Sequence, residues 1–278
     1  PVPPPPVPPP PAALATDALI VWNEDGLHAM NPDGSGLRLL IPGEIGSAVW
    51  SPDRSLIAYT HGTGGIRIAA ADGTGVRKLT QGHHATWSPS GGQIGFKCTH
   101  RDLIGSESAH ICVIDSGGGT REDLTPADQL NDTPAWSARR VIAFRHFPDN
   151  TNDPIRIEVM EESGEGRKTL LELGEDETAT DFDWAPDGSA LALSKKPNTD
   201  VAYDIWTVDA GGPLRQLTSS QGVYELKPSY SPHGSRIAFL RHAPYSEGAP
   251  PAELWIMGSS GEDPKPIPGT TGFYGVDW

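Results

Sequence analysis

The sequence has few cysteines, few basic residues and no long apolar run, and each shortage excludes a class of protein. Two cysteines, Cys98 and Cys112, are too few for a disulfide-rich scaffold. No stretch approaches the roughly 20 apolar residues that cross a bilayer as a helix. Lys and Arg number 21 against 36 Asp and Glu, for a net charge of -15. Because so acidic a chain repels phosphate backbones, nucleic acid is not an expected partner. Basic proteins, cations and neutral ligands remain possible partners. Alternatively, the negative charge serves only to keep the protein soluble.

Motifs of common enzyme classes are also missing. The chain contains no G-x-S-x-G nucleophile elbow, no Gly-Lys-Ser/Thr phosphate loop and no H-E-x-x-H zinc helix. The run from Asp181 to Asp183, with Asp187-Gly188, faintly resembles a calcium loop, but the repeat described below explains Asp187-Gly188 as a turn. No cofactor is therefore expected from a motif, and no catalytic residue is assigned.

Glycine and proline are abundant, at 32 and 28 residues, which indicates many turns between short strands. Nine of the prolines lie in the first eleven residues, PVPPPPVPPPP. Such a run favours extended polyproline II, so residues 1–17 are predicted to be a Pro-rich linker, or else a ligand for a proline-binding module. Because residue 1 is Pro rather than Met, we expect a trimmed chain that follows an export signal, an anchor or another domain.

The remaining residues, 18–278, repeat one short pattern. An aromatic residue begins a Ser-Pro turn that leads into an apolar strand, as in AVWSPDRSLIAY (48–59) and ATWSPSGGQIGF (85–96). Tight Gly-rich turns and two further strands follow in each unit, so each unit predicts four antiparallel strands, here called a to d. The aromatic residues that end strand a are Trp50, Trp87, Trp136, Trp184, Tyr230 and Trp278.

Units of this kind predict a single all-β domain, a six-bladed β-propeller of four-stranded antiparallel blades. The first unit begins at Ala18 and lacks its own strand a, whereas the chain ends with GFYGVDW, which is such a strand and nothing more. The C-terminal strand, at about 273–278, is therefore expected to complete blade 1 and close the ring. A fragment of a longer propeller is the alternative.

These residues resemble a known family. The unit is similar to the TolB-like, WD-repeat-like (PD40-type) propeller repeat, and the similarity extends over about 18–278. It rests on five features of each unit: the W-S-P turn, the I-A-F strand, the I-x-V-M strand, the Asp-Gly turn and the R-x-L strand. The resemblance implies a propeller fold. Similar propellers bind protein partners in the bacterial envelope, precede prolyl-oligopeptidase-like peptidases, act as sensors behind transmembrane kinases and occasionally are lyases.

Loop length points to one face of the propeller as the candidate binding surface. The b–c loops are long in units 3 to 6 (98–110, 146–154, 195–204 and 241–253), and they share a face with the d–a loops. Seven of the nine histidines, including His110, map to this face. The predicted partner-binding residues are His61, His83, His84, His100, Asp102, Asp128, Asp132, His146, Asp149, Asp153, Glu175, Asp176, Tyr203, His242 and Tyr245. Solvated loops without a ligand are the alternative.

The central channel is a second candidate. Strand a is innermost, so its alternate residues are expected to line the channel. Predicted channel-lining residues are Ser47, His84, Thr133, Asp181, Lys227, Asp183 and Asp277. Such a ring suits water, a small ligand or an ion, and imidazoles beside carboxylates suit zinc or manganese. A water-filled structural channel is the favoured interpretation.

The two cysteines are expected to be separate, buried small side chains. Aligning the repeats places Cys98 opposite Ile111, which would put Cys112 on the other face of the sheet. A disulfide would need a different register, because its geometry is strict.

The sequence thus predicts a non-enzymatic, monomeric module without a transmembrane segment or a cofactor. The expected partner is a protein or peptide of basic character, bound on the face of the b–c and d–a loops, and the resemblance implies an extracytoplasmic location, anchored through a removed segment. The alternatives are a metal-assisted lyase or hydrolase, with His84 and Asp181 nearest the axis, and a sensor or accessory propeller of a longer chain.

Overall fold

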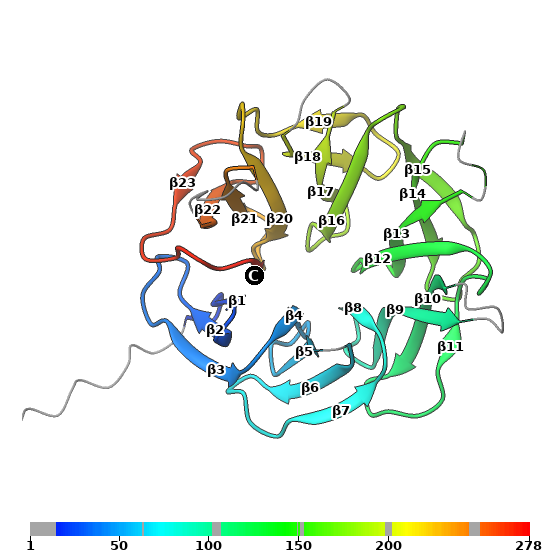
Figure 1. The fold of residues 1–278 in the computed structure, drawn as a ribbon, viewed down its shortest axis with the longest axis horizontal. Coiled ribbons are helices and arrows are strands. Elements are labelled where there is room, and N and C mark those ends of the chain that lie inside the picture. Colours follow the sequence, from blue (N-terminus) through cyan, green and yellow to red (C-terminus); the bar gives the residue numbers. More distant parts are fainter. Residues whose placement is uncertain are drawn as a thin grey trace, which may run out of the picture.

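The fold is a ring of six antiparallel sheets, each of four strands, arranged around a central axis (Figure 1). The computed structural model describes residues 15–62, 64–101, 107–148, 150, 153–197, 202–244 and 251–278, with the backbone alone at 100, 101 and 107. No helix occurs among these residues. The prediction of an all-β, six-bladed propeller is confirmed.

Each blade has the strand order a-b-c-d from the axis outward. In blades 1 to 6 strand a is β24 (Gly275–Asp277), β4 (Ile45–Trp50), β8 (His83–Trp87), β12 (Leu130–Trp136), β16 (Thr178–Trp184) and β20 (Tyr224–Tyr230). Strand b is β1 (Leu19–Asn23), β5 (Leu56–His61), β9 (Gln93–Arg101), β13 (Val141–Phe147), β17 (Ala190–Lys196) and β21 (Arg236–His242). Strand c is β2 (Gly26–Met30), β6 (Ile66–Ala70), β10 (Glu107–Asp115), β14 (Arg156–Glu161), β18 (Asp204–Asp209) and β22 (Glu253–Gly258). Strand d is β3 (Arg38–Pro42), β7 (Arg77–Thr80), β11 (Glu122–Asp123), β15 (Lys168–Glu172), β19 (Leu214–Gln216) and β23 (Lys265–Pro266).

The repeated serine after each aromatic residue fixes the a–b turn. In blade 2 the hydroxyl oxygen of Ser51 accepts the N–H of Leu56 at 2.9 Å, and the Ser51 carbonyl accepts the N–H of Arg54 at 2.8 Å. Ser88 and Ser231 accept the equivalent strand-b N–H groups at 3.0 Å each. The Ser-Pro pattern therefore recurs because it satisfies turn donors that a buried corner would otherwise leave unpaired.

The core lies between the blades. The aromatic residues of the I-A-F strands, Tyr59, Phe96, Phe144 and Phe239, are fully buried, and the apolar clusters join strands of neighbouring blades. A single blade cannot bury both of its faces, so the repeat itself is what makes the fold stable.

The two ends of the chain meet in blade 1. β24 pairs with β1 through Ile20 and Asp277, and through Trp22 and Gly275. The indole N–H of Trp278 donates to the carbonyl of Asp17 at 2.7 Å. Gly275 is required at this junction, because a Cβ atom there would lie 1.9 Å from the Trp22 ring. The predicted closure by the C-terminal strand is confirmed.

Blade 3 departs from the sequence prediction. Residues 98–101 and 107–110, expected as loop, extend the β9–β10 hairpin. The register pairs Cys98 with His110 rather than with Ile111, so Cys112 shares the face of Cys98. The two form a disulfide with Cα atoms 6.0 Å apart, and the expectation of unlinked cysteines was wrong. A register change of one residue moves a side chain to the other face, which is the reason for the error.

Within the described part of the chain, no helix is long and apolar enough to cross a membrane. The predicted linker falls mostly on residues 1–14, which lie outside the described residues.

Candidate functional site

The b–c and d–a connections lie on one side of the ring, here called the loop face, and strand a of each blade begins there. Two sets of strand-a residues line the channel. The mouth ring, three residues before each aromatic residue and next to the loop face, comprises Ser47, His84, Thr133, Asp181, Lys227 and Gly275. The anchor ring, one residue before each aromatic residue, comprises Val49, Thr86, Ala135, Asp183, Ser229 and Asp277.

Four mouth-ring residues have a left-handed backbone. His84, Thr133, Asp181 and Lys227 have φ angles of 52°, 53°, 53° and 55°. The pairing of strands a and b shifts register in the same segments, so a bulge produces this conformation in four consecutive blades. Left-handed backbone costs an L-residue about 1–2 kcal/mol, and a β-branched residue such as Thr133 is rarely found there. Strain of this kind clusters at functional sites.

The channel behind the mouth ring is small. A cavity of about 130 Å³ is lined by the anchor ring and by every mouth-ring residue except Gly275, and the lining includes all seven predicted channel-lining residues. It holds several waters or an ion, whereas pockets for drug-sized ligands have about 300–1,000 Å³. The seven residues are therefore together, but the cavity is too small for an extended substrate to enter.

The charges at the mouth are partly paired. Lys227 Nζ lies 3.1 Å from Asp181 Oδ1. The His84 ring faces the channel solvent, and the surrounding blades and the Lys227 cation lower its pKa to about 4. His84 is thus neutral at pH 7, and because its side chain is exposed, solvent screening leaves the shift with little free energy.

The anchor ring links each blade to the next. Side-chain oxygens accept the backbone N–H of the next blade's aromatic residue at four junctions: Asp277 from Trp50 (2.9 Å), Thr86 from Trp136 (3.0 Å), Asp183 from Tyr230 (2.6 Å) and Ser229 from Trp278 (3.0 Å). At the two junctions where the ring residue is apolar, the indole N–H donates to its backbone carbonyl instead. These bonds are Trp87 to Val49 (3.3 Å) and Trp184 to Ala135 (3.0 Å). All six junctions are therefore hydrogen-bonded at the same level, which gives the anchor ring a structural role.

Two carboxyl groups of the anchor ring have raised pKa values. Burial, followed by the proximity of Asp277, raises the pKa of Asp183 to about 8. Burial also raises the pKa of Asp277 to about 6, against the favourable hydrogen bond from Trp50. At pH 7 Asp183 is protonated, so the two acids do not repel each other as a pair of anions.

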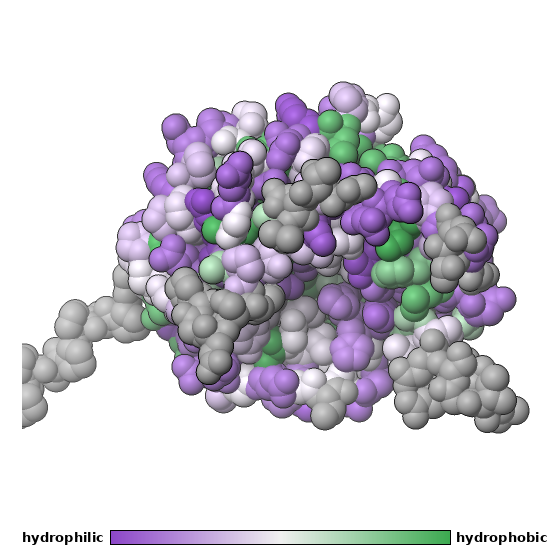
Figure 2. Space-filling view, turned by 45° about the horizontal axis from the view of Figure 1, so that its top comes forward, coloured by the Kyte–Doolittle hydropathy of each residue, from purple (hydrophilic) through white to green (hydrophobic). Residues whose placement is uncertain are grey.

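Exposed acidic residues lie on the loop face at blade 1 (Glu24, Asp25 and Glu44) and at blades 3 and 4. Asp128, Glu175 and Asp176 lie in d–a loops and Asp153 in a b–c loop, and all four are exposed. Leu130, two residues after Asp128, is 41% exposed. Figure 2 shows hydrophilic side chains over most of the visible surface, with separate hydrophobic areas between them. The acidic group with its apolar neighbour forms a surface that a protein partner can contact.

Other predicted residues make contacts within the fold. Asp132 is buried and accepts two hydrogen bonds from Arg145, at 2.8 and 2.9 Å. His146 Nδ1 lies 2.9 Å from Asn131 Oδ1. Tyr224 stacks edge-on with Tyr203 (5.6 Å) and with the buried His242 (5.3 Å).

The remaining predicted residues are dispersed. His61 and His83 are half-buried at strand ends, and His110, assigned to the loop face, is instead fully buried in β10. Asp102, Asp149, Tyr245 and the side chain of His100 lie outside the described residues.

Sequence reasoning missed Arg145 and Lys97, which both approach Asp132; Lys97 Nζ lies 3.8 Å from its carboxylate. The signal was available, because each directly follows an I-A-F type strand, in IAFR and IGFK. Neutral or apolar residues follow the equivalent segments of blades 2, 5 and 6, namely Thr60, Ser194 and Leu240.

The comparisons with known proteins agree on the fold. No protein-family model matches the chain. A segment of 105 residues, 35% of this chain, is 37% identical to the Tol-Pal system protein TolB of Gluconobacter oxydans (strain 621H), and covers 23% of that protein. The crystal structure of TolB from Acinetobacter baumannii superposes with a TM-score of 0.73 at 20% identity, over 94% of this chain and 65% of that one.

A putative TolB from Agrobacterium tumefaciens gives a TM-score of 0.69 at 17% identity, over 92% of this chain and 90% of that one. A more distant match is an oligogalacturonate lyase in complex with manganese, at a TM-score of 0.61 and 16% identity, over 88% of this chain and 70% of that one. The alignments thus span less than a quarter of the curated relative and about two thirds of the Acinetobacter structure. The predicted TolB-like propeller is confirmed.

Proposed function

Because the chain is a TolB-like six-bladed propeller, we propose that it is a non-enzymatic module that binds a protein or peptide partner on the loop face. The observation that carries this is the exposed acidic group, Asp128, Glu175 and Asp176, beside exposed Leu130 on the face where the strained mouth ring opens. Loops held on a rigid scaffold are where binding residues concentrate.

The small cavity at the loop-face end of the channel supports a macromolecular partner on that face. The cavity of about 130 Å³ behind the mouth ring does not enclose a drug-sized ligand, so on the loop face a partner would contact the outer surface of the loops. The net charge of -15 favours a partner of basic character, which the acidic loops would attract and orient. Binding of this kind weakens as salt increases.

We place the module outside the cytoplasm of a bacterium. The Cys98–Cys112 disulfide supports this location, because disulfides persist in oxidising compartments. The matched relative is a protein of the Tol-Pal system, and by analogy the partner belongs to the cell envelope.

The alternative, a metal-assisted lyase, has less support. Its basis is the similarity to a manganese-bound lyase. Among the described residues, however, the one group of three or more potential metal ligands that lies together is in blade 3, away from the mouth. At the mouth, Lys227 pairs with Asp181 and places a cation close to His84, which makes that site less favourable for a metal ion.

Capture from an envelope extract tests the proposal. The bait variants are a loop-face triple, Asp128→Asn with Glu175→Gln and Asp176→Asn, and a matched triple on the opposite face, Asp115→Asn with Glu165→Gln and Asp209→Asn. Both sets draw on neighbouring blades, remove three charges and change exposed residues only. Bound proteins are quantified by mass spectrometry.

We expect the wild type and the opposite-face triple to retain the same partner, and the loop-face triple to lose most of it. Equal retention by all three baits would show that the acidic loops are not the binding surface. Retention of nothing by the wild type, at low as well as at physiological salt, would contradict the binding module itself.

A further inference from the structure

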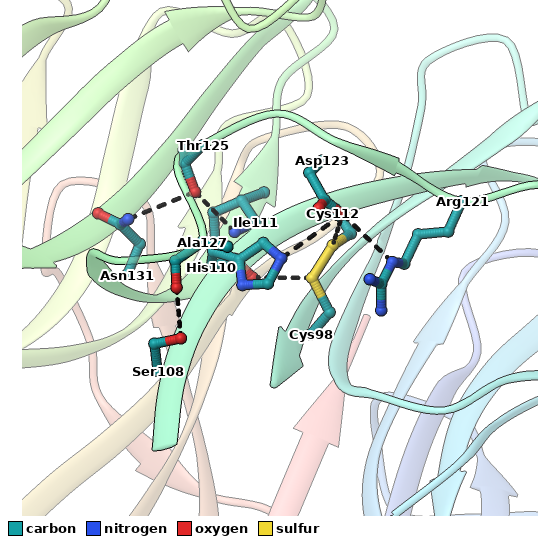
Figure 3. Close-up of polar contacts among 10 residues, drawn as sticks. All are labelled: Cys98, Ser108, His110, Ile111, Cys112, Arg121, Asp123, Thr125, Ala127 and Asn131. Atoms are coloured by element: carbon teal, nitrogen blue, oxygen red, sulfur yellow. Dashed lines mark hydrogen bonds and ion pairs between the residues drawn. A yellow bond between two sulfur atoms is a disulfide. The ribbon is translucent and has the colours of Figure 1, made fainter. Parts of the chain in front are cut away.

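Four potential metal ligands meet on one face of blade 3 (Figure 3). Cys98 lies on β9, His110 and Cys112 on β10, and Asp123 on β11. Cys98 pairs directly with His110, and Cys112 pairs directly with Asp123. Residues 110 and 112 are two apart on one strand, so all four side chains leave the sheet on the same side.

The ligand atoms are close together. One sulfur, nitrogen or oxygen atom from each of the four residues lies within 4.8 Å of the others. His110 Nε2 lies 3.5 Å from Asp123 Oδ1, and Cys112 Sγ lies 3.1 Å from the same oxygen. Cys98, His110 and Cys112 are at most 1% exposed, whereas Asp123 is exposed. The cluster is thus a buried pocket with one carboxylate at its solvent side.

We propose that the reduced chain binds one Zn²⁺ ion at Cys98, His110, Cys112 and Asp123, and that the Cys98–Cys112 disulfide is the alternative, metal-free state of the same site. Two sulfurs, one imidazole and one carboxylate form a donor set typical of tetrahedral zinc. Tetrahedral Zn–N and Zn–O bonds place nitrogen and oxygen about 3.4 Å apart, close to the 3.5 Å between His110 and Asp123.

Conversion to the metal-bound state requires the sulfur atoms to separate. Tetrahedral Zn–S bonds of about 2.3 Å place two sulfurs about 3.8 Å apart, against about 2.0 Å in a disulfide. The two side chains can supply this difference by small rotations, because the Cα atoms are already 6.0 Å apart on neighbouring strands. The backbone ladder of β9 and β10 does not need to change.

The chemistry balances with a dithiol as reductant. The dithiol gives two electrons and two protons to the sulfurs of Cys98 and Cys112 and becomes a cyclic disulfide. Zn²⁺ then replaces both thiol protons, which go to solvent, while His110 and Asp123 donate lone pairs. Disulfide formation by an oxidant removes both thiolate ligands, so the metal is released.

The negative charge of the zinc-bound site is balanced by the cation of Arg121. Zn²⁺ with two thiolates and one carboxylate carries a net charge of -1. The Arg121 Nε atom lies 3.2 Å from Asp123 Oδ1, so its cation lies next to that charge. Arg121 is a positioning residue here, because it orients the carboxylate and contributes no ligand.

Cobalt binding tests the proposal, because Co²⁺ replaces zinc and absorbs visible light strongly when thiolates hold it in a tetrahedron. The full chain is reduced with dithiothreitol, freed of reductant under anaerobic conditions and titrated with Co²⁺, after which Zn²⁺ is added. Asp123→Asn alters only the exposed ligand, so it keeps the fold, and Cys98→Ser with Cys112→Ser removes both sulfurs. His233→Asn, an exposed histidine in blade 6, is the control.

We expect one equivalent of cobalt with thiolate charge-transfer bands in the reduced wild type and in His233→Asn, displaced by Zn²⁺. The oxidised chain and the double serine variant should give no such bands, and Asp123→Asn should bind at least about tenfold more weakly. Absence of the bands in the reduced wild type would overturn the proposal, as would equal affinity in Asp123→Asn and His233→Asn. Zinc binding does not depend on partner binding at the loop face, so each of the two proposals can fail without the other.

Discussion

The anchor ring and the mouth ring lie two residues apart on the same innermost strands, and they differ in what their side chains contact. Each anchor-ring residue forms a hydrogen bond with the next blade, through a side-chain oxygen at four junctions and a backbone carbonyl at two. Mouth-ring residues make no such repeated contact among the described residues, and four of them have a strained backbone. One repeat thus produces a ring that holds the blades together and a ring that leaves its side chains facing the channel.

The two rings show that one repeat can hold stabilising contacts at one position of strand a and leave another position free to vary. At the anchor ring four positions are Asp, Thr or Ser and two are Val or Ala, because either an accepting side chain or an accepting carbonyl completes the junction. At the mouth ring the residues are Ser, His, Thr, Asp, Lys and Gly, which share no chemistry. We therefore expect substitutions in the anchor ring to lower stability. Substitutions in the mouth ring should leave stability nearly unchanged, except at Gly275, which packs against Trp22.

The largest effect is expected at Gly275, the one mouth-ring position that tolerates no side chain. Gly275→Ala places a Cβ atom 1.9–2.0 Å from buried atoms of the Trp22 ring, at the closure of the propeller. Overpacking of this kind costs about 1–3 kcal/mol, so the Tm should fall by several degrees. Thermal unfolding followed by circular dichroism measures this. Gly117→Ala, where no atom lies within 4 Å of the new Cβ, is the control, and equal Tm values would contradict the closure account.

Removal of an anchor-ring acceptor should have the next largest effect. Asp183→Ala leaves the Tyr230 N–H without its 2.6 Å partner and should lower the free energy of unfolding by about 1–3 kcal/mol. Asp183→Asn keeps an acceptor oxygen and should cost much less. Urea unfolding distinguishes the two variants. If they are equally destabilised, the hydrogen bond is not what links these blades.

The pH dependence of stability should be smaller and should come from Asp183 above neutral pH. Its pKa is raised from 3.8 to about 8, so between these values the folded state binds more protons than the unfolded state. Stability should therefore fall as pH rises toward 8. Measurement between pH 7.5 and 8.5 avoids the opposite contribution of His84, because an unfolded-state imidazole with a pKa of 6.5 is almost fully deprotonated there. Asp183→Asn should flatten the curve relative to the wild type, and parallel curves would show that Asp183 keeps no proton.

The smallest effect is expected at His84. His84→Gly relieves the left-handed strain at φ 52° but adds backbone entropy to the unfolded state, so the free energy of unfolding should stay the same or rise by up to about 1 kcal/mol. A loss as large as that of Asp183→Ala in urea would remove the distinction between the two rings.

The fold was predictable because its information is local and repeated. The Ser-Pro turns, the apolar strands and the C-terminal GFYGVDW each encode a contact that any blade must make. The Cys98–Cys112 disulfide was not predictable from alignment of the repeats, because the longer β9–β10 hairpin takes a register one residue away from the predicted one. Arg145 could have been singled out, because a basic residue follows the I-A-F strand only in blades 3 and 4, but its pairing with Asp132 depends on the register of β12 and β13.

The most direct test of the central claim is the affinity of the captured partner for the two triple variants. Three exposed charges are worth about 0.2–1 kcal/mol each, so the loop-face triple should bind about tenfold more weakly than the wild type at physiological salt. The opposite-face triple should bind as the wild type does, and the difference should shrink at high salt. Equal weakening by both triples would show that only net charge matters, and would contradict a binding site on the loop face.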